Sequence, residues 1–202
     1  VLQEIVLAIG AMASLMIGAW CGPRAAAFIT VLAICLLGAT GVIEYLLPKG
    51  RLVTFGGGFI VDEFARFLKI AALAGSAATL VLSREFIEDD SRRMFEFAIL
   101  VMLSTVGMMV LISAADLIML YLGLELMSLA LYVVAASNRD NVKSTEAGLK
   151  YFVLGALASG MLLYGASLIY GFTGTVSFAG IAAAAKTGSI GIVFGLVFLL
   201  AG

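Results

Sequence analysis

Residues 116–136 read DLIMLYLGLELMSLALYVVAA, and after the opening Asp116 this stretch contains a single charged residue, Glu125. The apolar run is continuous and about 20 residues long, the length that an α-helix needs to cross a bilayer core of about 30 Å. A membrane-spanning β-strand would be about 10 residues long and would alternate in polarity. Because lipid offers no partners to backbone polar groups, the stretch predicts a transmembrane helix.

The rest of the chain has the same character, with 63% hydrophobic and 12% charged residues and a mean hydropathy of +1.16. Soluble domains have roughly 45–50% apolar and about 25% charged residues. The sequence therefore predicts an all-α integral membrane protein, a polytopic bundle of transmembrane helices. Apolar windows of about 19 residues place six spans, at residues 1–20, 25–47, 64–83, 94–113, 116–136 and 149–171. A seventh apolar run begins near Ser189 and is still apolar at Gly202, so we expect a helix that continues beyond this point.

Composition also excludes several classes of site. The net charge is −1 and the charges are spread between the spans, so no nucleic-acid partner is implied and the lipid bilayer is the expected surrounding. Histidine is absent, and Cys21 and Cys35 stand in apolar surroundings without CxxC spacing. Haem, iron–sulfur and zinc ligation are therefore unsupported, and we expect no cofactor or metal in this chain. The first run lacks a basic segment before it, so we interpret it as a mature helix and not a cleaved signal.

Orientation follows from the basic residues on alternate sides of the membrane. The first, third and fifth connections hold seven, Arg24, Arg84, Arg92, Arg93, Arg139, Lys143 and Lys150. The other side holds five, Lys49, Arg51, Arg66, Lys69 and Lys186. The excess predicts a cytoplasmic first connection and an N-terminus on the periplasmic face.

Two connections carry local predictions. Between Ser113 and Asp116 the chain turns with almost no spare residues, so the flanking helices should form an antiparallel hairpin with either residue capping a helix start. The amphipathic stretch 59–69 leads into the third span. Its charged residues are expected on a polar face at the start of that helix: Asp62, Glu63, Arg66 and Lys69.

Glu125 lies near the expected middle of the bilayer. Nine residues separate it from Asp116, about 13 Å of helix, which is too far for a glutamate to reach the interface. A central carboxylate costs a few kcal/mol, so such acids usually face a bundle interior or a wet cavity and serve ion or proton paths. Helical spacing places three hydroxyls on the same face, Tyr121, Ser128 and Tyr132. The alternative is a protonated glutamate that only holds a neighbouring helix by a hydrogen bond.

Lys150 and the residues after it permit simpler interpretations. Lys150 opens the predicted sixth helix four residues after Glu146, so an i,i+4 ion pair at the interface explains it as well as a role in proton transfer does. The sixth span also carries small residues that let helix backbones approach closely, and we interpret these as packing: Gly155, Ala156, Ser159 and Gly160.

Three segments occur in order, GLELMSL at 123–129, SNRDNVKSTEAGLKYF at 137–152 and LLYGASLIYGFTGT at 162–175. Together with FIVDEFARFLK at 59–69, they resemble the subunit N family of the bacterial proton-pumping NADH:quinone oxidoreductase, respiratory complex I, one of its antiporter-like subunits. The resemblance implies the first part of an antiporter-like inverted-repeat fold. Residues 1–83 would form three N-terminal helices and residues 94–202 the first, incomplete repeat, ending inside the seventh helix.

The same resemblance implies a function. The chain would be a proton-translocating membrane-arm subunit in a bacterial inner membrane, in contact with other membrane subunits of the complex. The flavin (FMN), iron–sulfur clusters and quinone site would lie in other subunits. Glu125 would pair with a lysine on the seventh helix, expected beyond Gly202, and Lys150 matches a lysine of the family, which supports a role for it in proton translocation.

Two other functions remain open at this point. The chain would also fit a multisubunit sodium/proton antiporter or a membrane-bound hydrogenase that uses the same glutamate with different partners. A membrane scaffold without transport, in which Glu125 only joins helices, is the third possibility.

Overall fold

The structure is a computed structural model that describes residues 1–46, 50–87, 91–185 and 189–202, without the side chains of residues 23–24, 84–87 and 91–94. Several basic residues used to predict orientation therefore lie outside the described part: Lys49, Lys186, and the side chains of Arg24, Arg84, Arg92 and Arg93. The connection at residues 88–90 also lies outside it.

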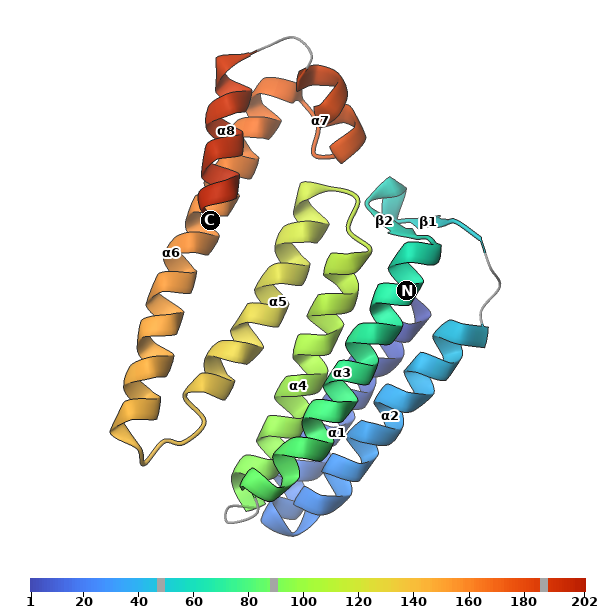
Figure 1. Ribbon diagram of the computed structural model, residues 1–202, viewed down its shortest axis with the longest axis vertical. Coiled ribbons are helices and arrows are strands. Elements are labelled where there is room, and N and C mark those ends of the chain that lie inside the picture. Colours follow the sequence, from blue (N-terminus) through green and yellow to red (C-terminus); the bar gives the residue numbers. More distant parts are fainter. Residues whose placement is uncertain (47–49, 88–90, 186–188) are drawn as a thin grey trace.

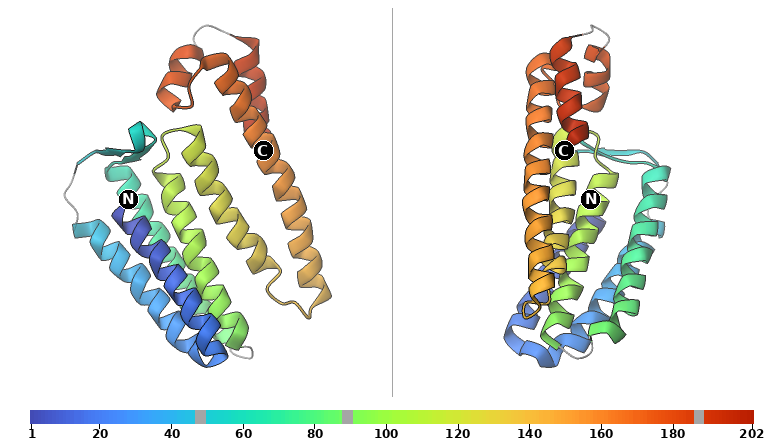
Figure 2. Two further views of the ribbon diagram at one scale, coloured as in Figure 1. Left: turned by 180° about the vertical axis from the view of Figure 1, so that it is seen from behind. Right: turned by 60° about the vertical axis from the view of Figure 1, so that its left-hand side comes forward.

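Within the described residues, six helices are long and apolar enough to cross a membrane, as the hydropathy windows predict. They are α1 (Leu2–Cys21), α2 (Ala26–Leu46), α3 (Glu63–Ile87), α4 (Ser91–Ile112), α5 (Leu117–Ala135) and α6 (Val142–Thr173). A short 3-10 turn (Gly22–Ala25) joins α1 to α2. Figure 1 shows α1–α4 gathered in one bundle, and both views of Figure 2 agree that α5 and α6 extend from the α4 side of it. The protein is a polytopic helix bundle.

The helix α6 begins earlier than the sequence predicts, at Val142 and not near residue 149. Asn141 caps it, because its side chain accepts a hydrogen bond from the backbone N–H of Lys143 at 3.0 Å. Gly174 ends the helix with φ 69°. At 1.5 Å per residue its 32 residues extend about 48 Å, longer than a bilayer core of about 30 Å. The polar first turns therefore stand outside the apolar span.

Two small elements were not predicted. A hairpin of β1 (Leu52–Thr54) and β2 (Phe59–Val61), joined by a 3-10 turn (Phe55–Gly57), follows α2. Its turn uses positive φ at Gly56 (63°) and Gly57 (100°), which explains the glycines there. The short helix α7 (Phe178–Ala185) precedes α8 (Ile190–Ala201), which occupies the seventh apolar run. Strands of three residues are too short to show an alternating pattern in the sequence.

Backbone hydrogen bonds join the hairpin, the α4–α5 turn and the α6–α7 turn at one end of the bundle (Figure 1). They run from Ile60 N to Ser113 O (2.9 Å), Ala115 N to Gly58 O (2.9 Å), Leu117 N to Val176 O (3.0 Å) and Phe178 N to Ala115 O (3.2 Å). The α4–α5 turn is therefore held between the other two connections. We call these four bonds the terminal ladder.

The core of the N-terminal bundle lies between α1, α2, α3 and α4. Its fully buried side chains interdigitate across the four helices and include Leu7, Ile29, Leu37, Leu80, Met102 and Met109. A polar contact also crosses this core, a hydrogen bond of 2.7 Å between the hydroxyls of Thr105 on α4 and Ser76 on α3. Both residues are buried among apolar side chains, so this contact gives each hydroxyl a hydrogen-bond partner that those side chains do not supply.

The helices α4 and α5 form the predicted antiparallel hairpin and pack in backbone contact. Asp116 caps α5, accepting a hydrogen bond from Met119 N at 2.7 Å, so the capping prediction is confirmed for this residue. Gly107 and Gly123 face each other at the crossing. A Cβ added to Gly107 would lie 2.5 Å from Met127 N and 2.8 Å from Gly123 O, which are backbone atoms that side-chain movement cannot displace.

Substitution of Gly107 by alanine should therefore destabilise the protein by about 1–3 kcal/mol, the usual effect of overpacking a close contact. The matched control is Gly160→Ala on α6, because a Cβ there meets no atom within 4 Å. Thermal unfolding of the purified full-length protein in detergent measures the difference. Equal melting temperatures for the two variants would contradict the close crossing.

Candidate functional site

Glu125 occupies the ninth position of the 19-residue helix α5, partly buried, with apolar turns on both sides. Its Oε2 accepts a hydrogen bond of 2.8 Å from the Ser159 hydroxyl of α6. Ser159 is 8% exposed, so this contact lies between the two helices and not at the lipid surface. The carboxylate therefore has one fixed donor on the neighbouring span.

A second hydroxyl continues the contact. The Tyr121 Oη lies 3.2 Å from Ser159 Oγ. Ser159 gives its only proton to Glu125, so Tyr121 must donate to Ser159 and the three groups form one directed chain. Hydroxyls can accept one proton as they donate another, so the chain can pass a proton to or from the carboxylate. Tyr121 and Glu125 lie one turn apart on α5, and Ser159 bridges them from α6.

The structure does not bring the other predicted hydroxyls to Glu125. No hydrogen bond joins Ser128 or Tyr132 to the carboxylate in the described part of the chain. Tyr132 is instead buried against the rings of Tyr151 and Phe152, at centroid distances of 4.7 and 5.8 Å. Their place in a proton path stays a prediction.

Lys150 takes the simpler of its two predicted arrangements. Its Nζ lies 2.5 Å from Glu146 Oε1, one turn earlier on α6, and the lysine side chain is 70% exposed. It lies in the third turn of α6 and does not open the helix as predicted, because α6 begins at Val142. A role for Lys150 in proton translocation also stays a prediction.

Ser159 is the residue of this site that sequence analysis assigned to packing. The pattern on α5 identifies only residues of α5, because helical periodicity carries no information about the facing helix. One signal was present: a hydroxyl interrupts the small residues of α6, and small residues mark the face that another helix approaches. Gly155, one turn earlier, shows that approach, since a Cβ there would lie 1.9 Å from the Tyr132 hydroxyl oxygen.

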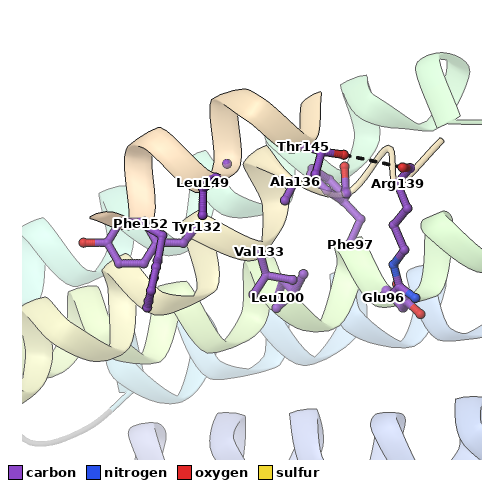
Figure 3. Close-up of a pocket in the computed structure, with 12 residues that line it drawn as sticks. Glu96, Phe97, Leu100, Tyr132, Val133, Ala136, Arg139, Thr145, Leu149 and Phe152 are labelled. Atoms are coloured by element: carbon purple, nitrogen blue, oxygen red, sulfur yellow. Dashed lines mark hydrogen bonds and ion pairs between the residues drawn. The ribbon is translucent and has the colours of Figure 1, made fainter. Parts of the chain in front are cut away.

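A pocket of about 480 Å³ lies between α4, α5 and α6 (Figure 3). Tyr132 and Phe152 line one end, and the exposed ion pair of Arg139 with Glu96, 3.2 Å long, lies at the other. Glu125 does not line this pocket. The pocket lies at the end of the bundle that holds the α5–α6 connection, and its inner wall is two helical turns from Glu125 along α5.

One sequence prediction about the third helix is partly wrong. Asp62 and Glu63 are exposed at the start of α3 as expected, but Arg66 and Lys69 are buried, with exposed fractions of 6% and 0%. The Lys69 Nζ donates to Glu4 Oε1 of α1 at 2.6 Å and lies 4.9 Å from the centre of the Phe59 ring. The hairpin and α1 cover this part of α3, which the amphipathic pattern alone does not reveal.

The part of the chain that the structure describes holds no group of three or more His, Cys, Asp or Glu side chains placed to bind a metal ion. Cys21 and Cys35 are both free and exposed on the helix surface. The chemistry visible in the described residues is therefore that of carboxylates, lysines and hydroxyls inside an apolar bundle.

Comparison with known proteins agrees with this arrangement. Residues 114–202 match the family model described as NADH:quinone oxidoreductase/Mrp antiporter, TM. The NADH-quinone oxidoreductase subunit N of Azorhizobium caulinodans is 57% identical over all 202 residues, which correspond to 42% of that relative. The chain thus spans about two fifths of the length of the curated relatives that it matches.

Solved structures show the same fold. A chain of respiratory complex I from Thermus thermophilus, solved with bound aureothin, superposes with a TM-score of 0.79 at 29% identity, over 99% of this chain and 42% of that one. The archaeal membrane-bound sulfane sulfur reductase matches with a TM-score of 0.80 over 98% of this chain and 42% of that one, and at 22% identity it shows the fold alone. Over all of its 202 residues the chain is therefore similar in sequence to subunit N of NADH:quinone oxidoreductase, and residues 114–202 match the membrane-domain model shared with Mrp antiporters.

Proposed function

We propose that this chain is part of a proton-translocating membrane-arm subunit of NADH:quinone oxidoreductase. The relatives that match the whole chain carry the name of subunit N of that enzyme. The chain spans 42% of their length, so the activity of the complete protein is inferred from them. The other membrane subunits of the complex are its proposed partners.

The observation that carries the proposal is the chain of Tyr121, Ser159 and Glu125 inside the apolar bundle. An ionisable group in the middle of a span is costly and is rarely retained without a role in ion or proton movement. A carboxylate used only to join helices would need one donor. The second hydroxyl in line behind Ser159 supplies a route for a proton, which a purely structural contact does not require.

Glu125 would work as a switch. While a lysine of a later helix stays beside it, the carboxylate would remain charged. If that lysine lost its own charge or moved away, the carboxylate would take up a proton. Movement of one charge against 100 mV costs about 2.3 kcal/mol, which quinone reduction in other subunits would supply. Those subunits would hold the flavin, iron–sulfur clusters and quinone. The pocket between Tyr132 and Arg139, which ends two helical turns from Glu125, would admit water from the membrane face that holds the α5–α6 connection.

We further propose the division of the chain and its placement. Residues 1–83 would be three leading helices, and residues 94–202 the first part of an antiporter-like repeat. In a bacterial inner membrane, the first connection and the loops that hold Arg84 to Arg93 and Arg139 to Lys150 would face the cytoplasm and the N-terminus the periplasm, following the excess of basic residues.

Cysteine labelling tests the orientation. In a chain with Cys21 and Cys35 replaced by serine, single cysteines at Ser91 and Ser137 should resist a membrane-impermeant reagent in intact cells and react after the cells are opened. Thr54→Cys, on the exposed β1 strand of the opposite end, is the matched control and should react in intact cells. Labelling of Ser91→Cys and Ser137→Cys from outside would show the orientation to be reversed.

Co-purification tests the complex. The tagged full-length subunit, extracted in mild detergent, should elute with NADH-oxidising activity that reduces a quinone analogue. Elution with hydrogenase activity, or with a sodium/proton antiporter that lacks NADH oxidation, would favour the alternatives and contradict this proposal. The family model names both oxidoreductases and Mrp antiporters, so this experiment separates them.

A further inference from the structure

A second carboxylate is buried in the N-terminal bundle, far from Glu125 in the sequence. Glu44, near the end of α2, is 1% exposed. Its Oε2 accepts a hydrogen bond from the side-chain amide of Gln3 on α1, itself 3% exposed. Its other oxygen, Oε1, is buried and has no hydrogen-bond partner. A fully buried carboxylate thus has one neutral donor, where charged carboxylates usually gather several donors or a cation.

The charged neighbours of Glu44 are already engaged or lie farther away. Lys69 of α3 donates to Glu4 of α1 at 2.6 Å, and no ion pair within 4.0 Å joins a cation to Glu44 in the described residues. Arg66, one turn before Lys69 on the same helix, is buried as well and has contacts of its own. Four ionisable side chains from three helices therefore lie at one end of the bundle, and in the described part of the chain no ion pair includes Glu44.

We propose that Glu44, held by Gln3 beside the Glu4–Lys69 ion pair, is a proton-binding site in the N-terminal bundle. The bound proton sits on Glu44 Oε1, and the Gln3 amide donates to the Oε2 carbonyl oxygen. A neutral carboxylic acid at this place avoids an unpaired buried charge and needs no donor other than the one present.

The surroundings separate this site from the aqueous face. Phe59 of β2 lies over Lys69, with the Nζ 4.9 Å from the ring centre, and is itself 3% exposed. A cavity of about 290 Å³ beside Glu4 is lined by apolar side chains that include Phe55, Phe59 and Val106. The hairpin thus covers the neighbouring Glu4–Lys69 pair. The inference is independent of Glu125 and goes beyond the proposed function, since it concerns helices that precede the proposed repeat.

Infrared spectra of the full-length subunit in its purified membrane complex, compared between the wild type and each variant, test the site. With carbon-13 glutamate to assign bands, the wild-type spectrum should contain the C=O stretch of a buried carboxylic acid that Glu44→Gln removes. The matched control is Glu146→Gln, an exposed carboxylate in an ion pair, which should leave that band unchanged. Gln3→Met should keep the band and move it to higher frequency, because the hydrogen bond to the carbonyl oxygen is lost.

The outcomes decide between a proton and other occupants. A spectrum in which Glu44→Gln removes no carboxylic acid band would overturn the proposal, as would a band whose frequency Gln3→Met does not change. If the band appears only when sodium salts are replaced by choline, the site takes a sodium ion and the proposal is wrong. Should Glu44→Gln prevent assembly of the complex, the Gln3→Met shift alone decides, since that variant keeps the carboxyl group.

Discussion

Replacement of Glu125 by glutamine is expected to lower the proposed proton translocation by a factor on the order of 10², the lower end of what a positioned proton-transfer group contributes. Glutamine keeps the size of the side chain and its hydrogen bond to Ser159 but cannot release a proton. Aspartate keeps the titratable group and withdraws it by one methylene, so Glu125→Asp should retain more activity than Glu125→Gln. Coupled quinone reduction should fall in the same order.

The ranking of the two variants distinguishes a relay from a structural contact. If Glu125 only joined α5 to α6, glutamine would be nearly silent, and aspartate would lose about 1 kcal/mol through the gap and the displaced acid. Proton uptake and NADH-driven quinone reduction in membrane vesicles give both measurements, with assembly checked by blotting. Glu146→Gln is the matched control because its carboxylate is exposed. A Glu125→Gln complex that assembles and pumps at the wild-type rate would remove the proposed role.

Replacement of Lys69 by methionine is expected to destabilise the protein by about 3–5 kcal/mol, the usual effect of breaking a buried ion pair. Lys69 is 0% exposed and its ammonium lies 2.6 Å from Glu4, so its loss removes the lysine that pairs with a second buried carboxylate near Glu44. The double variant Glu4→Gln with Lys69→Met should recover much of the loss, because it removes both charges together.

Thermal unfolding of the full-length protein in detergent measures these changes. Lys150→Met is the matched control, since that lysine forms an ion pair of 2.5 Å but is 70% exposed and solvent screens it. It should change the melting temperature little. Lys69→Met and Lys150→Met with the same small effect would show that the Glu4–Lys69 pair contributes nothing to stability.

The parts of the fold that the sequence predicted are those that depend on one segment at a time. The length and the continuous apolar character of its own residues are sufficient to predict α5. Asp116 marks the start of this helix because it caps the first turn. The hairpin over α3 was missed because three-residue strands have no periodicity to detect, and α7 because eight apolar residues are shorter than any span. The start of α6 was misplaced because its first turns are polar although helical.

The candidate site divides in the same way. Glu125 was identified because a lone charge in a span is unusual whatever surrounds it. The contacts of Ser159 and Lys69 depend on which helices pack against each other, and a single sequence without its structure does not give those neighbours. Glu4, Glu44 and Lys69 lie near the ends of α1, α2 and α3 that an up-and-down order of the helices places at the same membrane face, so their proximity could have been predicted from the sequence. Charges at helix ends are, however, ordinarily assigned to the membrane interface.

The terminal ladder has a consequence for biogenesis. Its four hydrogen bonds connect segments around residues 58–60, 113–117 and 176–178, and the last of these leaves the ribosome only after α6 has been synthesised. The bonds can form only if all three segments have reached the same membrane face. A nascent chain in which α3, α4, α5 or α6 failed to insert would place at least one segment in the opposite compartment. The ladder would then stay open, exposing backbone groups that a quality-control protease can recognise.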